Sequence, residues 1–309
     1  MSMRTVQENV PLAPLTTFGI GGQAQYLVDV KNEEEVREAL VWAKKKSLRF
    51  VILAGKSNVL VPDEGLEALV VHLVEGDFSL ESTNLTADAG CNLLKLIREC
   101  SGQGIGGWEK MAGIPGTIGG AVRGNAGAFG PEIRDFATSV RALNTKTGEV
   151  RVFENKECDF SYRHSFFKDH PEWIITRVHL ALKSVEPSGS KRLIEETIAE
   201  REKRHIQNVR AAGSFFVNPV VSREMQEIFE KEKGMKSREG RVPAGWLIEK
   251  VGMKGARVGD AVASEQHPNY LKNDGEARAV DVLALAEKIK AAVREKFGIG
   301  LKEEAAIIE

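Results

Sequence analysis

The spacing of hydrophobic residues in the first 75 positions predicts strands around one helix. Three apolar runs have the length of buried strands: 25–30, 49–53 and 65–73. Between the first two, residues 34–46 place Val36, Leu40 and Ala43 on one face of a helix. A strand–helix–strand unit usually forms a parallel sheet, so we expect parallel strands here. Residues 1–18 show no periodic pattern, which predicts irregular structure.

The middle of the chain has the alternating pattern of antiparallel strands. Two hairpins are predicted, 79–82 with 84–88 and 140–144 with 149–154. Strict alternation over 173–183 predicts one long strand. A helix over 92–100 precedes a glycine-rich loop, 113–130.

The last third of the chain is mainly helical. Pro187-Ser188-Gly189-Ser190 is the best candidate for a domain boundary. Four helices are predicted: 191–205, 223–233, 244–251 and 279–297. Gly298 follows the last one as a left-handed C-cap. Two further segments have strand character, 214–216 and a closing strand over 301–308.

Composition and charge exclude several classes of protein. The 309 residues are 42% hydrophobic, 28% charged and nearly neutral, with 43 Lys+Arg against 44 Asp+Glu. This balance argues against a nucleic-acid or anionic-membrane partner, and no apolar run is long enough for a membrane span. Three cysteines without CxxC spacing and six histidines without HExxH predict neither disulfides nor a metal. We expect a cytoplasmic protein of about two domains.

Two side-chain-poor loops are the candidates for a cofactor site. Residues 113–130 contain seven glycines and one proline beside Ile, Val and Phe, which suggests a backbone wall against a flat ligand or a pyrophosphate. Ala54-Gly55-Lys56-Ser57-Asn58 follows a predicted strand and suits a phosphate, although an ordinary turn explains it equally well. It lacks the first glycine of a P-loop, and Gly19-Ile20-Gly21-Gly22 precedes a strand, unlike a dinucleotide fingerprint. A pyrophosphate bridging the two loops is our hypothesis.

Four polar residues have both a functional and a structural interpretation. Arg163 lies among aromatic residues and needs an anion if it is buried, although a structural ion pair would suffice. Ser214 precedes an apolar run, where serine is usually a cap or turn residue. Glu303 and Glu304 ordinarily would be solvated, but their strand context suggests that one carboxylate is partly buried.

At these residues the chain resembles the UDP-N-acetylenolpyruvoylglucosamine reductase family over nearly its whole length. The motifs that carry the resemblance, in order, are Thr17-Phe18-Gly19-Ile20-Gly21-Gly22, Ser57-Asn58, Ala112-Gly113-Ile114-Pro115-Gly116-Thr117, Asn125-Ala126-Gly127-Ala128, Tyr162-Arg163, Gly213-Ser214-Phe215-Phe216, Asn218-Pro219, Trp246-Leu247-Ile248-Glu249 and Lys254-Gly255. The short connection after Arg163 is similar to the form that lacks an inserted tyrosine-bearing loop.

The resemblance implies an α+β fold: a two-lobed FAD-binding domain of the vanillyl-alcohol-oxidase (PCMH) type and a separate α+β substrate domain. The expected FAD domain is 1–187, with lobes of about 1–74 and 75–187. The substrate domain is 188–298, and 299–309 is a C-terminal strand with the catalytic glutamate. The implied cofactor is non-covalent FAD with NADPH as co-substrate, acting on a UDP-sugar enolpyruvyl substrate. We expect a monomer.

The resemblance also implies roles for individual residues. Ser214 matches the proton donor, and Arg163 and Glu304 match the pair that stabilises the intermediate. The implied cofactor-binding residues are Ala54, Gly55, Lys56, Ser57, Asn58, Gly113, Ile114, Pro115, Gly116, Thr117, Gly120, Asn125, Ala126 and Gly127. Tyr162, Asn218 and His267 match substrate contacts, although His267 on its own merits is a structural residue.

The chain departs from the family's sequence pattern at two places, and two other functions remain as alternatives. Glu304 is preferred over Glu303 by counting through the family's Leu-x-Pro-Glu-Val pattern, which is imperfect here. Val217 stands where the family usually has lysine, and the candidates to replace it are Arg210, Arg123 and Lys254. The rivals are another FAD-dependent oxidase or dehydrogenase, and a non-catalytic flavin-binding protein.

Overall fold

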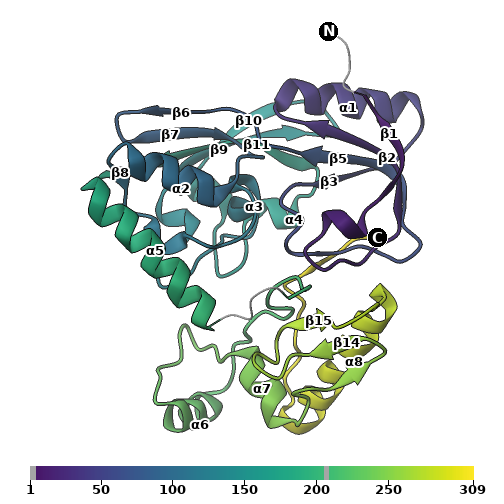
Figure 1. Ribbon diagram of the computed structural model, residues 1–309, viewed down its shortest axis with the longest axis vertical. Helices are drawn as coiled ribbons and strands as arrows, with labels where there is room; N and C mark the ends of the chain where they lie inside the picture. The colour runs from purple at the N-terminus through teal and green to yellow at the C-terminus, as the bar shows by residue number, and fades with distance from the viewer. Residues whose placement is uncertain (1–4, 205–208) are drawn as a thin grey trace. The chain divides into compact units, whose positions relative to one another are not determined.

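The computed structural model describes residues 5–204 and 209–309 (Figure 1). The chain divides into two compact units, each assembled from three segments. Unit 1 comprises Met1–Val10, Ala24–Lys56 and Leu66–Arg204, and unit 2 comprises Pro11–Gln23, Ser57–Gly65 and His205–Glu309. The two units are therefore not consecutive stretches of sequence, because two short early segments pack with the C-terminal third.

The first sheet of unit 1 is built around a central parallel strand. Its order is β1 (Gln7–Pro11), β2 (Gln23–Val30), β5 (Leu66–Leu73) and β3 (Phe50–Leu53). The predicted parallel arrangement is confirmed, although β5 lies between the two strands that helix α1 (Glu33–Lys45) connects. The prediction of irregular structure over 1–18 is wrong at β1, whose polar sequence has no alternation and becomes a strand by pairing with β2.

The second sheet of unit 1 is antiparallel. Its order is β10 (Val150–Glu154), β9 (Ala137–Asn144), β11 (Trp173–Ala181), β7 (Asn84–Asp88) and β6 (Phe78–Glu81). Both predicted hairpins are confirmed. The predicted strand over 173–183 is interrupted, since β11 ends at Ala181 and β12 (Lys183–Ser184) pairs separately with β8 (Ile105–Gly106).

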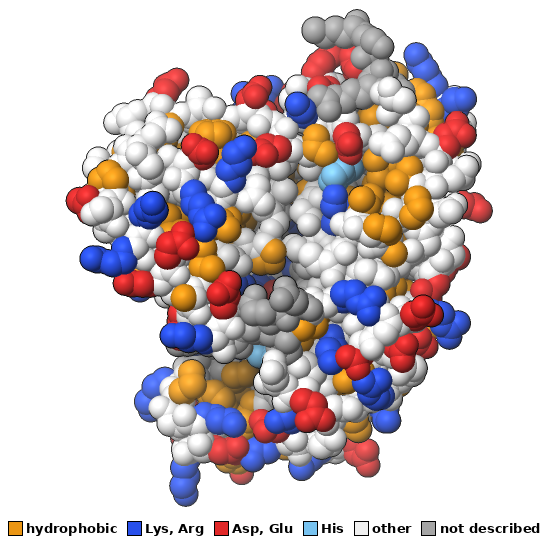
Figure 2. Space-filling model, viewed as in Figure 1, with side chains coloured by type: hydrophobic (Ala, Val, Ile, Leu, Met, Phe, Trp, Pro, Cys, Tyr) orange, Lys and Arg blue, Asp and Glu red, His pale blue; other side chains and the backbone are white. Residues whose placement is uncertain are grey.

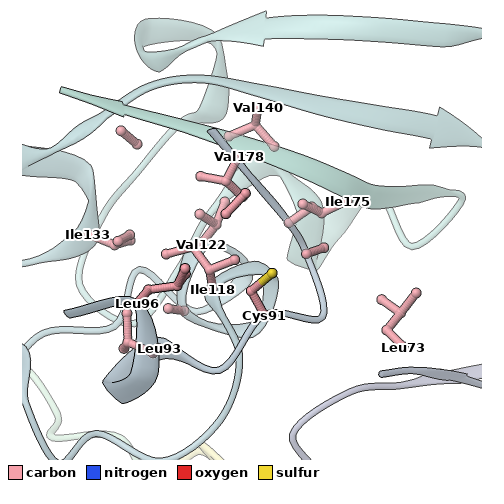
Figure 3. Packing of buried hydrophobic residues seen from close by; sticks show 14 of the residues in the cluster. Leu73, Cys91, Leu93, Leu96, Ile118, Val122, Ile133, Val140, Ile175 and Val178 are labelled. Atoms are coloured by element: carbon pink, nitrogen blue, oxygen red, sulfur yellow. The ribbon is translucent and has the colours of Figure 1, made fainter. Parts of the chain in front are cut away.

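Part of the core of unit 1 lies between the second sheet and two helices, α2 (Leu93–Gly102) and α3 (Ile118–Arg123). Figure 3 shows Val140 and Val178 of the sheet pointing toward Leu96 of α2 and Val122 of α3. All four side chains are at most 1% exposed, and burying each contributes about 1.5–3 kcal/mol. This packing fixes the glycine-rich segment against the sheet.

Helix α5 (Pro187–Arg204) belongs to unit 1, which changes the expected boundary. The residues Pro187–Ser190 are its first turn rather than a linker, a position where proline is tolerated. The Ser190 hydroxyl donates a buried hydrogen bond of 2.6 Å to Glu109, and α5 runs beside α2 (Figure 1). The predicted helix end at His205 lies outside the described residues.

Glu33, the first residue of α1, ties this helix to the second sheet. Its carboxylate accepts hydrogen bonds from Arg141 Nε at 2.8 Å and Nη2 at 3.2 Å, and from Thr176 Oγ1 at 3.1 Å. Burial raises the pKa of Glu33, but these hydrogen bonds and the charge of Arg141 outweigh it and hold the pKa below its ordinary value.

We expect Glu33→Gln to lower the free energy of unfolding by about 1 kcal/mol at neutral pH, because an amide loses the ionic part of these bonds and Arg141 is partly solvated. A carboxylate whose pKa is lower in the folded protein stabilises it above the unfolded-state pKa and loses this effect as the pH falls through the folded-state pKa. Urea unfolding at neutral and acidic pH measures this. A difference from the wild type that persists below the folded-state pKa contradicts the assignment.

In its described residues, unit 2 combines three α-helices with small sheets. The helices are α6 (Arg223–Lys233), α7 (Ala244–Lys250) and α8 (Ala279–Phe297). One sheet contains β13 (Arg257–Val258), β14 (Ala261–Ala263) and β15 (Leu271–Asn273), and β16 (Ala306–Ile307) pairs in parallel with β4 (Val59–Leu60). Phe18 and Leu60 are buried in the same core as α8, which explains why their segments belong to this unit.

In unit 2, the predicted end of a helix is correct, whereas the predicted extents of two strands are not. The predicted C-cap is confirmed, since Gly298 has φ +67° and donates its N–H to Arg294. The closing strand over 301–308 shrinks to the two residues of β16. The predicted strand at 214–216 is wrong, because Phe216 forms only an isolated bridge with Glu303.

The described residues also show how charge is distributed on one face, whether any helix could cross a membrane, and the state of the cysteines. On the face drawn in Figure 2, acidic and basic side chains are intermingled. Among the helices that the structure describes, none combines the length and apolar character that crossing a bilayer requires. Burial raises the pKa of Cys91 to about 11 and of Cys100 and Cys158 to about 12, so these free thiols stay protonated at neutral pH.

Candidate active site

The two predicted cofactor loops are in backbone contact within unit 1. Gly55 follows β3, and a Cβ placed on it would lie 2.5 Å from Gly116 Cα and 3.2 Å from the Thr117 nitrogen. Real Cβ atoms do not approach backbone so closely, so only glycine fits at this contact. Gly116 itself has φ +113°. Ala54, Gly55 and Lys56 therefore adjoin the start of the glycine-rich segment, as the two-loop hypothesis requires.

The glycine-rich segment is not an unbroken loop, because it contains α3. The Thr117 hydroxyl caps this helix by accepting from Gly120 N at 3.2 Å. Gly119 faces the sheet, where a Cβ would lie 2.6 Å from that of Ala89. Close packing on Ala89 thus overrides the low helix propensity of glycine. Gly120 faces more open space, with its nearest neighbour at 3.5 Å.

We expect Gly55→Ala to separate the two loops, lowering the free energy of unfolding by about 1–3 kcal/mol and weakening FAD binding by about tenfold or more. Gly124→Ala is the matched control, because a Cβ there meets its nearest atom at 3.6 Å. Flavin titration and thermal unfolding of both variants check this. Equal FAD affinities in the two variants contradict the importance of the contact.

The end of the segment is held by Asn125, whose side chain is fully buried. Its amide nitrogen donates to Glu132 at 2.8 Å and to the Ser161 carbonyl at 2.9 Å, and its oxygen accepts from Arg134 N at 3.2 Å. The side chain is committed to these bonds, so the predicted cofactor role of Asn125 rests on its backbone. Ala126 packs against the core beside it.

Arg163 lies beside this segment in unit 1. Ser161 and His164 exchange backbone hydrogen bonds, which forms a tight turn with Arg163 at φ +58°. The guanidinium donates to the Gly127 carbonyl at 3.3 Å and lies 5.1 Å from the centre of the Tyr162 ring. The charge is thus held close to the glycine-rich segment, and both side chains are half-buried.

Lys56 is one of three polar side chains in consecutive contact, an arrangement that was not predicted from the sequence. Its Nζ lies 2.6 Å from His72 Nε2, and His72 Nδ1 lies 2.6 Å from Asp29 Oδ1. Burial is the main cause that lowers the pKa of Lys56 and of His72, so we assign a neutral imidazole that accepts from the lysine and donates to the aspartate. His72 and Asp29 are opposite each other in the pairing of β5 with β2, a relationship that only the sheet register reveals.

The chain enters unit 2 directly after Lys56. The Ser57 carbonyl accepts from the Thr17 hydroxyl at 3.2 Å. The Asn58 side chain donates to the Glu304 carbonyl at 3.1 Å. These two predicted cofactor residues therefore belong to the same unit as the C-terminal glutamate.

Within unit 2, two predicted catalytic residues come from adjoining segments. Glu304 N–H donates to the Phe215 carbonyl at 2.7 Å, and Val217 N–H donates to the Lys302 carbonyl at 2.9 Å. Ser214 is half-buried, and its hydroxyl makes no hydrogen bond among the described residues of this unit. Glu304 is also half-buried, whereas the neighbouring Glu303 forms an ion pair of 2.9 Å with Lys290.

The predicted substrate residues of unit 2 have structural contacts. Asn218 Oδ1 accepts from Ala244 N at 2.9 Å, at the start of α7. The His267 ring packs edge-on to Tyr270 with centroids 4.7 Å apart, and burial lowers the pKa of His267, which favours the neutral ring. Of the three possible substitutes for a lysine at Val217, Arg210 and Lys254 lie in unit 2 and Arg123 in unit 1.

Comparisons with known proteins cover nearly the whole chain. A family model described as UDP-N-acetylenolpyruvoylglucosamine reductase, C-terminal domain, matches residues 204–308, and one described as FAD binding domain matches residues 24–154. A Solibacter usitatus protein named UDP-N-acetylenolpyruvoylglucosamine reductase is 34% identical over 98% of this chain and 96% of its own length. A protein of the same name from Pseudomonas putida is 35% identical over 96% and 97%, respectively.

A solved structure gives the same result. The crystal structure of UDP-N-acetylenolpyruvylglucosamine reductase from Thermus caldophilus matches with a TM-score of 0.76 and 32% identity, covering 99% of each chain. The predicted fold class is thereby confirmed as an α+β protein with an FAD-binding domain. Identity above 30% over nearly the full length of several relatives shows that this chain belongs to the UDP-N-acetylenolpyruvoylglucosamine reductase family.

Proposed function

We propose that this protein is an FAD-dependent oxidoreductase that uses NADPH to reduce UDP-N-acetylglucosamine enolpyruvate to UDP-N-acetylmuramate, a step of peptidoglycan precursor synthesis. The names of the full-length relatives and the FAD binding domain match support this proposal. One observation carries it: the hydrogen bond from Glu304 N to the Phe215 carbonyl joins the backbone of the C-terminal glutamate to the residue that follows Ser214, which is remote in sequence. That pair suits proton delivery in the second half of the reaction.

The residues of unit 1 fit a flavin dinucleotide. Gly55 and Gly116 leave bare backbone at the junction of two loops, which suits the close approach of a pyrophosphate. The proposed contacts here are Ala54–Lys56, Gly113–Thr117, Gly120 and the backbone of 125–127. When bound, FAD supplies the hydride that the substrate accepts. We propose that unit 1 binds FAD and that unit 2 carries most substrate contacts.

Three side chains carry the proposed proton and charge chemistry. The double bond of the substrate gains a hydride at its distal carbon and a proton at the carbon that bears the carboxylate. The Ser214 hydroxyl donates that proton, and Arg163 stabilises the negative charge that develops toward the substrate carboxylate. Serine is a weak acid in water, so the transfer needs a dry site and support from Glu304. Tyr162, Asn218 and His267 are proposed substrate contacts.

An anaerobic titration tests the function. NADPH bleaches the flavin absorbance of the purified protein, and the enolpyruvyl substrate then restores it. UDP-N-acetylglucosamine, which lacks the enolpyruvyl group, is the control and leaves the flavin reduced. A protein that binds no FAD, or whose reduced flavin is not reoxidised by the substrate, refutes the proposal.

The cellular setting of the enzyme follows from its proposed substrates. We infer a cytoplasmic monomer that serves cell-wall growth, and through it cell shape and division, because the precursor reaction uses soluble nucleotide substrates. The intermingled surface charges in Figure 2 suit a protein without nucleic-acid or membrane partners. Size-exclusion chromatography with light scattering determines the oligomeric state.

A further inference from the structure

A buried asparagine forms hydrogen bonds with the two residues that immediately follow Ser214. Asn269 precedes β15 and is 2% exposed. Its side-chain oxygen accepts from Phe216 N at 2.9 Å, and its side-chain nitrogen donates to the Phe216 carbonyl at 2.8 Å. Its backbone carbonyl accepts from Phe215 N at 2.7 Å. Asn269 thus provides Phe215 and Phe216 with backbone hydrogen-bond partners that a neighbouring strand would otherwise provide.

The opposite side of the same segment is held by the C-terminal residues. The Phe215 carbonyl accepts from Glu304 N at 2.7 Å, and Val217 N–H donates to the Lys302 carbonyl at 2.9 Å. Both phenylalanine side chains are at most 1% exposed. Asn269 and Glu304 therefore meet at one short stretch of backbone, one from each side.

The residue before Ser214 provides no comparable support. Gly213 has φ +76°, and a Cβ placed on it would meet nothing within 4 Å. The backbone there is free of tight packing and has the flexibility of glycine. Ala211, on the far side of Gly213, is held by the Thr17 hydroxyl at 2.8 Å, so the bonds at Phe215 and Phe216 are the fixed contacts that lie nearest to Ser214.

We propose that Asn269 is a positioning residue that aims the Ser214 hydroxyl, an inference that rests on the proposed function. Its amide is suited to this task because it donates and accepts at once, as the N–H and C=O of Phe216 require. Aspartate accepts but, when ionised, cannot donate, so it leaves the buried carbonyl unpaired beside a negative charge. Proton transfer is sensitive to small displacements of the donor, so a shift of Ser214 slows it.

The test compares Asn269→Ser and Asn269→Asp with Asn273→Ser and Asn273→Asp. Asn273 is the matched control: it is 5% exposed, lies in the same unit, and accepts from Ala277 N at 3.0 Å and Gly275 N at 3.2 Å. It bonds no residue from 214 to 217 in the part of the chain that the structure describes. Anaerobic stopped-flow absorbance follows flavin reduction by NADPH and reoxidation by the enolpyruvyl substrate separately.

We expect both Asn269 variants to be reduced by NADPH at nearly the wild-type rate and to be reoxidised on the order of 10- to 100-fold more slowly. The Asn273 variants keep both rates and lose only stability. Asn269 variants that are reoxidised as fast as their Asn273 counterparts, that lose both half-reactions equally, or that alone fail to bind FAD overturn the positioning role. A wild-type flavin that the substrate cannot reoxidise refutes the proposed function instead.

Discussion

Ser214→Ala will leave flavin reduction by NADPH close to the wild-type rate and slow reoxidation by the enolpyruvyl substrate by about 10²- to 10⁴-fold. Replacing the hydroxymethyl side chain by a methyl group removes the proposed proton donor without adding volume. The half-buried hydroxyl makes no hydrogen bond among the described residues of unit 2, so its loss leaves no protein group unpaired there. Stopped-flow absorbance of the two half-reactions measures the effect.

Ser222→Ala is the control for this experiment. The Ser222 hydroxyl caps α6 by accepting from Met225 N at 3.3 Å, so its removal costs stability of about 1 kcal/mol and no proton transfer. Both half-reactions of this variant should match the wild type. If Ser214→Ala slows both half-reactions to the same degree, the hydroxyl positions or stabilises the site and is not the proton donor.

Glu304→Gln will reduce turnover by about 10²-fold, whereas Glu303→Gln will change it little. Glu304 adjoins the Ser214 segment through its hydrogen bond to Phe215. Glu303 instead pairs with Lys290, which also contacts Glu287 at 2.7 Å, and these hydrogen bonds from the two glutamates raise the pKa of Lys290. The Glu303 carboxylate is thus bound to a lysine of α8.

The comparison of the two glutamine variants uses steady-state turnover and thermal unfolding. Glu303→Gln is expected to lower the unfolding free energy by about 0.5–1 kcal/mol through loss of a partly exposed ion pair. Glu304→Gln should slow reoxidation of the reduced flavin more than its formation. The reverse order of turnover assigns the catalytic carboxylate to Glu303, one residue earlier in the C-terminal segment.

Elements with a strong local pattern are predicted well. The bounds of α6 and α8 agree with the prediction at both ends, because each has a repeating apolar face and a glycine with positive φ directly after it. The two antiparallel hairpins of unit 1 are also predicted, since their strands are joined by short turns. In these cases the residues that decide the structure are neighbours in sequence.

Elements that depend on distant partners are predicted poorly. The strand expected at 214–216 is reduced to an isolated bridge with Glu303, and the N–H and C=O of Phe216 pair with the side chain of Asn269 rather than with another strand. The domain boundary expected at Pro187 is a helical turn because α5 packs on α2 and on the 3-10 helix Glu109–Met111. Neither partner can be identified from the local sequence.

The candidate site shows the same division. Residue types at 54–58 and 113–127 are enough to suggest a cofactor site, whereas the expected roles of residues 163, 214 and 304 come from the resemblance to the family. The sequence does not reveal the structural role of the Asn125 side chain, the contact of Lys56 with His72, or the importance of Asn269. Each of these depends on a hydrogen bond to a residue that the sequence pattern does not connect to it.

The sequence by itself determined the local elements, the supply of bare backbone and chemically suitable side chains, and the family. Only the tertiary structure decided which of these groups meet: Gly55 with Gly116 in unit 1, and Phe215 with Glu304 in unit 2. The physical reason is that helices and turns are stabilised by neighbours along the chain, whereas these contacts form only after two remote segments have each packed into the same core.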